Sequence, residues 1–119
     1  MKFHEYLGKL GGVSHLYANA SNALKDLLDY LVRRGAIAQP NIILPSYIPA
    51  KIYRTALAAG LEVKFLEVHD TCIFDINDLE RLIDSKTIAV FHVHYFGFPY
   101  KIEEALAISK KKGDRKSVV

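Results

Sequence analysis

Residues 92–99 read HVHYFGFP and place two histidines and three aromatic side chains within eight positions. They directly follow the apolar run at residues 88–91. His92 and His94 lie two positions apart, so on an extended strand their side chains share one face, an arrangement found in some metal sites. The sequence offers no clear third ligand, and we therefore expect no metal site here.

The composition of the same octet favours a structural turn after a buried strand. In such a turn, one imidazole hydrogen-bonds a neighbouring loop and Gly97 reverses the chain. Pro99 then begins the next helix, because proline suits the first helical turn. We expect the remaining aromatic side chains to pack around the strand end; they are Tyr95, Phe96 and Phe98.

A second candidate lies at residues 19–21, Asn-Ala-Ser, just before a helical pattern that starts near Asn22. Free amides at a helix amino end and the Ser21 hydroxyl could hold an anion. The stretch lacks the glycines of a Walker loop or a dinucleotide fingerprint, so plain capping by Asn19 or Ser21 remains the simpler alternative. Tyr47, beside Pro45 at another expected strand end, is a third candidate because its hydroxyl could point into a crevice.

Alternating apolar runs and helical patterns position these residues. The runs lie at residues 13–17, 42–44, 63–68 and 87–93, and the helical patterns at about 22–34, 49–59, 75–83 and 100–112. Continuous apolar strands are typical of a parallel sheet covered on both faces. We therefore predict a three-layer α/β fold, with any ligand site outside the carboxyl ends of the strands.

Composition limits the alternatives. A chain of 119 residues, 50% hydrophobic and 24% charged, holds one domain, and no apolar run is long enough to cross a bilayer. The net charge of +3 is small and gathers near residues 110–116, so we expect neither a nucleic-acid nor a membrane partner. Cys72, the single cysteine, indicates neither a disulfide nor a zinc site. Residues 1–6 show no signal-peptide pattern, and we expect a cytoplasmic protein.

Taken in order, these segments resemble the DegT/StrS-type sugar aminotransferases, which are pyridoxal-phosphate enzymes of fold type I. Residues 19–24 look like the family's Ser-Gly-Thr-Ala-Ala-Leu phosphate loop, and residues 42–48 (IILPSYI) look like its VIxPSYT strand end. Residues 59–65 and 75–83 are similar to the next two family segments. The most specific piece, residues 86–99, resembles "tkAiipvHyfGxp".

The resemblance implies the incomplete large domain of a fold type I transferase, with a mostly parallel sheet flanked by helices. It implies that Asn19, Ala20 and Ser21 hold the phosphate of pyridoxal 5'-phosphate, that Tyr47 lies at the cofactor, and that His94 and Phe96 lie on a substrate-side loop. The parent enzyme would transfer an amino group from an amino-acid donor, typically glutamate, to a keto-sugar nucleotide. Such enzymes make sugars for cell-surface polysaccharides or secondary metabolites, usually as homodimers.

In the family, the aspartate that pairs with the pyridine nitrogen and the Schiff-base lysine follow the segment that resembles residues 14–113. Neither has a counterpart in these 119 residues, so no catalytic residue is assigned and we expect this chain to be an inactive amino-terminal fragment. Residues 114–119 depart from the apolar strand expected there and match what a common sequencing adapter encodes, which predicts a non-native tail. The alternative is a non-catalytic α/β ligand-binding or regulatory module.

Overall fold

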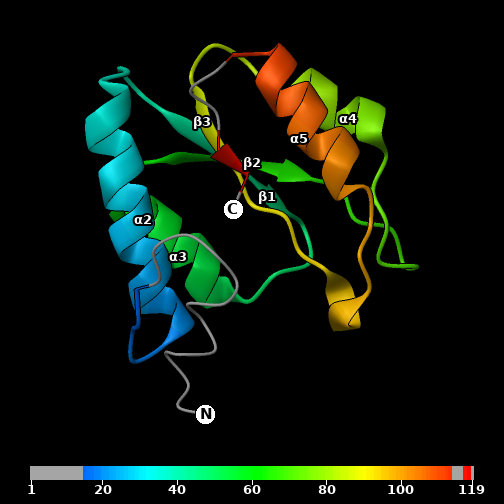
Figure 1. The fold of residues 1–119 in the computed structure, drawn as a ribbon, viewed down its shortest axis with the longest axis horizontal. Helices are drawn as coiled ribbons and strands as arrows, with labels where there is room; N and C mark the ends of the chain where they lie inside the picture. Colours follow the sequence, from blue (N-terminus) through cyan, green and yellow to red (C-terminus); the bar gives the residue numbers. More distant parts are fainter. Residues whose placement is uncertain (1–14, 114–116, 119) are drawn as a thin grey trace.

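A parallel sheet lies between two pairs of helices in the computed structural model, which describes residues 15–113 and 117–118 (Figure 1). The helices α2 and α3 cover one face, and α4 and α5 cover the other. The elements in chain order are α2 (Ala20–Gly35), β1 (Asn41–Pro45), α3 (Ala50–Ala58), β2 (Glu62–Leu66), α4 (Ile76–Leu82), β3 (Thr87–Val90), the short 3-10 turn η1 (Tyr95–Gly97), α5 (Ile102–Lys111) and β4 (Ser117–Val118). The predicted three-layer α/β fold is confirmed.

The four strands follow the order β2-β1-β3-β4, and every neighbouring pair is parallel. Ile42 pairs with Val63 on β2 and with Ala89 on β3, and the register on the β3 side shifts between Asn41 and Ile42. Because the strands are parallel, the loops after β1, β2 and β3 all leave from one edge of the sheet. This edge is where the sequence predicts a site.

All residues of β1 are buried, and its successive side chains pack into the core on alternate faces of the sheet. Ile42 and Leu44 pack with the helices α2 and α3, whereas Ile43 packs on the side of α4 and α5. Helix α2 contributes Leu24 and Leu28, whose spacing gives the helix one apolar face. The continuous apolar run on β1 therefore reflects a strand covered on both sides.

Several predicted boundaries are wrong; β2, for example, ends at Leu66 rather than Val68. Residues 15–17 of the expected first strand are irregular, and residues 13 and 14 lie outside the described chain. A strand needs a neighbour to take its backbone hydrogen bonds, and no described strand pairs with residues 15–17. Strand β3 ends at Val90 rather than Val93, and α5 begins at Ile102 because Lys101 has a left-handed backbone (φ 46°).

The short strand β4 extends the sheet beyond β3, where the sequence predicted no strand. Ser117 pairs with Ala89 and Val118 pairs with Val90. Within the described residues, no helix is both long and apolar enough to cross a membrane.

Candidate functional site

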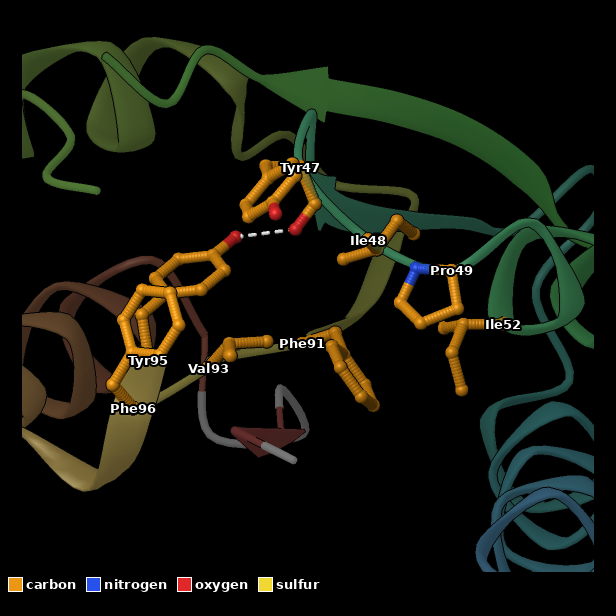
Figure 2. Close-up of a pocket in the computed structure, with 8 residues that line it drawn as sticks. All are labelled: Tyr47, Ile48, Pro49, Ile52, Phe91, Val93, Tyr95 and Phe96. Carbon is orange, nitrogen blue, oxygen red and sulfur yellow. Dashed lines mark hydrogen bonds between the residues drawn. The ribbon is translucent and has the colours of Figure 1, made fainter. Parts of the chain in front are cut away.

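A cavity of about 600 Å³ opens at the carboxyl edge of the sheet, between the loop after β1 and the segment after β3 (Figure 2). Its wall is almost entirely apolar or aromatic. It is formed by Tyr47, Ile48, Pro49, Ile52, Phe91, Val93, Tyr95 and Phe96. Such a surface suits a flat, largely apolar ligand group.

Tyr47 and Tyr95 join the two loops that form this cavity. The Tyr95 hydroxyl donates a hydrogen bond to the backbone oxygen of Tyr47 at 2.6 Å. Their rings are stacked, with centroids 5.7 Å apart and planes at 29°. Burial raises the pKa of Tyr95 above its ordinary value, and the neighbouring Cys72 and Tyr47 act in the same direction. The Tyr95 hydroxyl therefore stays protonated, and able to donate, throughout the neutral range.

Phe96 lies on the rim of the cavity, in the turn η1. Its side chain is 82% exposed and its backbone is left-handed, with φ 55° and ψ 22°. Gly97, at φ 81°, reverses the chain as predicted. The expected packing of Phe96 and Phe98 around the strand end is wrong, because Phe98 is also 75% exposed.

A second cavity, of about 340 Å³, lies on the other side of the same turn. It shares Val93, Tyr95 and Phe96 with the first cavity. Its remaining wall comes from the loop after β2 and the segment before α5; these residues are Asp70, Thr71, Cys72, Ile73, Phe98, Pro99 and Tyr100. Three segments far apart in the sequence thus meet around Tyr95.

His92 and His94 lie side by side but play different structural roles. Their ring centroids are 5.1 Å apart, and His92 also meets the ring of Phe74 edge-on at 5.6 Å. Burial lowers the pKa of His92, a backbone hydrogen bond with Tyr100 opposes this shift, and His94 reinforces it. His94 is exposed and lines neither cavity. Residues 15–113 and 117–118 contain no group of three side chains able to hold a metal ion.

Asn19, Ala20 and Ser21 lie at the amino end of α2. The side chain of Asn19 accepts a hydrogen bond from the Asn22 amide at 3.0 Å, so Asn19 rather than Ser21 caps the helix. Ala20 and Ser21 are the first helical residues, and amides at these positions have no partner within a helix. None of the three lines the cavity that contains Tyr47 and Phe96.

Sequence reasoning missed several residues of the larger cavity. Ile52 lies in the first turn of α3, and Phe91 and Val93 lie in the segment that follows β3. Their apolar character indicated only a buried core. Their position beyond two neighbouring strand ends was the available signal, because ligand crevices form there in parallel sheets.

Many solved structures share this fold, including the following three. The sugar aminotransferase Spr1654 of Streptococcus pneumoniae, described as putative, matches 78% of this chain at 19% identity with a TM-score of 0.63. CalS13, a sugar aminotransferase of Micromonospora echinospora, matches 80% at 22% identity with a TM-score of 0.61. The GDP-4-keto-6-deoxy-D-mannose-3-dehydratase of E. coli matches 76% at 24% identity with a TM-score of 0.63.

These likenesses show the fold of the chain. The chain has the fold of part of a fold type I pyridoxal-phosphate enzyme and spans about a quarter of the length of each structure, 24%, 28% and 24% respectively. A sequence model of the DegT/DnrJ/EryC1/StrS aminotransferase family matches residues 1–113. The chain belongs to this family, as the resemblance predicted. A comparison with curated protein sequences finds no match.

The residues present fit part of a pyridoxal phosphate site. The amino end of α2 suits a phosphate, because its partial positive charge and free amides attract anions. The aromatic wall at Tyr47 suits a flat ring. No lysine lines either cavity, so these walls supply no amine for a covalent link to an aldehyde.

Proposed function

We propose that residues 1–113 are the amino-terminal part of the large domain of a pyridoxal-phosphate sugar aminotransferase. The observation that carries the proposal is the family match over these residues. The parent enzyme transfers an amino group from an amino-acid donor to a keto-sugar nucleotide, for polysaccharide or secondary-metabolite sugars. In this proposal it works in the cytoplasm as a homodimer, with no nucleic-acid or membrane partner.

The proposed cofactor contacts divide between two parts of the carboxyl edge. The amides of Ala20 and Ser21 and the Ser21 hydroxyl hold the phosphate, with Asn19 keeping the helix end in place through its bond to Asn22. Tyr47 lies beside the ring, and Phe96 and His94 lie toward the substrate. When bound, the cofactor supplies an electron sink for the amino-group transfer.

The 119-residue chain by itself is proposed to be inactive. Its cavity walls contain aromatic and aliphatic side chains and no lysine. The residues that the family uses for the Schiff base and for the pyridine nitrogen have no counterpart in this sequence. Residues 114–119 are proposed to be foreign to the domain, because their sequence departs from the apolar strand of the family.

Sequencing of the source DNA through codon 113 and beyond tests these proposals. We expect the frame to continue into a strand with an aspartate and, later, a serine-and-lysine segment, with residues 114–119 replaced by other codons. The longer chain should then transfer nitrogen from glutamate to a keto-sugar nucleotide. A frame that ends after Val119 in the genome would contradict the enzyme proposal and favour a ligand-binding or regulatory module.

The phosphate contact has its own test in the longer chain. Ser21→Ala removes a hydroxyl from the proposed anion site and should weaken binding of pyridoxal 5'-phosphate by about tenfold, as expected for a charge-assisted hydrogen bond. Ser85→Ala removes a hydroxyl from an exposed loop and is the matched control. Equal affinities in the two variants would remove Ser21 from the site.

A further inference from the structure

The turn that contains Tyr95 is held by its own backbone. The amide of Gly97 donates to the oxygen of His94 at 3.0 Å, and the amide of Phe98 donates to the oxygen of Tyr95 at 3.0 Å. The backbone of Tyr95 is part of this hydrogen-bonded turn, and its ring and hydroxyl extend to the loop after β1 (Figure 2). These two hydrogen bonds fix the backbone from which the Tyr95 side chain extends to the neighbouring loop.

The loop after β1 is held on both sides of the point that Tyr95 reaches. The Ser46 amide donates to the oxygen of Leu66 at 2.8 Å, and the Ile52 amide donates to the oxygen of Pro49 at 3.0 Å. Between these bonds, the backbone oxygen of Tyr47 accepts from Tyr95. The bond therefore secures the middle of the segment that carries Tyr47, Ile48 and Pro49 into the larger cavity.

Tyr95 also belongs to the partition between the two cavities. It lines the larger one together with Tyr47 and the smaller one together with Cys72. Movement of its ring would change the width of both cavities at once.

We propose that Tyr95 is a positioning residue: it fixes the Tyr47–Pro49 segment against the turn after β3 and so sets the shape of the cavity. This role depends on the proposed function in one respect: under that proposal, the cavity receives the cofactor ring. The hydrogen bond and the stacked rings act together, because the bond fixes the distance between the loops and the ring contact fixes their angle.

Amide hydrogen exchange on the 119-residue chain, without any ligand, tests the role. Tyr95→Phe keeps the ring and removes the donor. We expect the amides of Ile52 and Gly97 to exchange about threefold to tenfold faster, as the loss of one hydrogen bond predicts. The amides of Ile43 and Val90, in the centre of the sheet, should keep their rates.

Tyr53→Phe is the matched control, because it also removes one tyrosine hydroxyl and leaves a ring that lies tilted against Phe65, with centroids 5.6 Å apart. It should leave the loop rates unchanged. Unchanged loop rates in Tyr95→Phe would overturn the proposal. So would a uniform increase that includes β1 and β3, which would make Tyr95 a general packing residue. A chain with no protected amides would overturn the structure on which the proposal stands.

The titration of Tyr95 is a second readout of its environment, because burial raises the pKa of this hydroxyl, with Cys72 and Tyr47 acting in the same direction. In the chain with ¹³C-labelled tyrosine rings, the resonance missing from Tyr95→Phe should titrate above the ordinary value of about 10. Titration at or below that value would contradict the burial of this hydroxyl between the two loops. Both measurements use the chain without cofactor, so their outcomes do not depend on whether the longer chain has transaminase activity.

Discussion

The ammonium nitrogen of Lys64 lies 2.5 Å from a carboxylate oxygen of Asp84, at the edge of the sheet opposite the candidate site. The other oxygen of Asp84 accepts a hydrogen bond from the Asn41 side chain at 3.0 Å. Thr87 donates to the Asn41 side chain at 2.7 Å. The network thus links β2, β1 and β3 through polar groups and keeps their register at this edge.

Asp84→Asn tests the charge in this network. The hydrogen bond from Lys64 is the main cause that holds the pKa of Asp84 well below its ordinary value, and partial burial opposes it. A lowered folded pKa stabilises the fold above the unfolded pKa of about 3.9, and this contribution is lost as the pH falls toward the folded value. The pair is partly exposed, so we expect the substitution to cost about 1 kcal/mol or less at neutral pH.

Thermal unfolding at a series of pH values measures this effect. The difference in Tm between the wild-type chain and Asp84→Asn should be present at neutral pH and shrink as the pH falls below about 4. Glu67→Gln, at an exposed position after β2, is the control for loss of one carboxylate. A Tm difference independent of pH would contradict the role of the Asp84 charge.

Thr87→Val tests the buried part of the network. Thr87 is 1% exposed, and its hydroxyl also accepts a hydrogen bond from the Asp84 amide at 3.0 Å. Valine keeps the shape but leaves the Asn41 oxygen and the Asp84 amide without this partner, which should cost about 1 to 3 kcal/mol in the free energy of unfolding.

Thr55→Val is the matched control for the Thr87 substitution. Its hydroxyl donates a solvent-exposed hydrogen bond to the Lys51 oxygen within α3, and we expect a change within about 0.5 kcal/mol. Urea unfolding of the two variants measures the comparison. Equal losses would show that the network at Thr87 adds no more than an exposed helix bond.

Leu28→Ala tests the core under α2. Leu28 is 0% exposed and packs against the β1 face that carries Ile42 and Leu44. The substitution removes a buried side chain and leaves a cavity, so the free energy of unfolding should fall by about 2 to 5 kcal/mol. Leu27→Ala, at a neighbouring position that is 37% exposed, should cost about 1 kcal/mol or less. Similar losses in urea unfolding would contradict the orientation of α2.

Phe96→Asn tests the strain in the turn after β3. A left-handed backbone costs most residues about 1 to 2 kcal/mol, and asparagine tolerates it better. Phe96 is 82% exposed, so little burial is lost, and the Tm should rise. Phe98→Asn removes a comparably exposed ring at φ −86° and should bring no gain. A lower Tm in Phe96→Asn would mean that its ring stabilises the turn.

Local patterns in the sequence predicted the helices and strands better than they predicted which side chains contact each other. The apolar run at residues 42–44 and the pattern at 75–83 predicted β1 and α4, because a strand covered on both faces and an amphipathic helix leave distinct periods. Asp75 caps α4, because its side chain accepts a hydrogen bond from the Asn77 amide. The partners of Asp84 were not visible in local signals, because they come from β1 and β2.

The sequence by itself determined the alternation of strands and helices, the left-handed glycine at Gly97 and the family to which the chain belongs. Only the tertiary structure decided the walls of the cavity. Tyr95 and Tyr47 are 48 positions apart, and they meet because β1 and β3 are neighbours in the sheet while β2 lies on the outside. Strand order depends on which apolar faces pack together across the whole domain, and no local period records it.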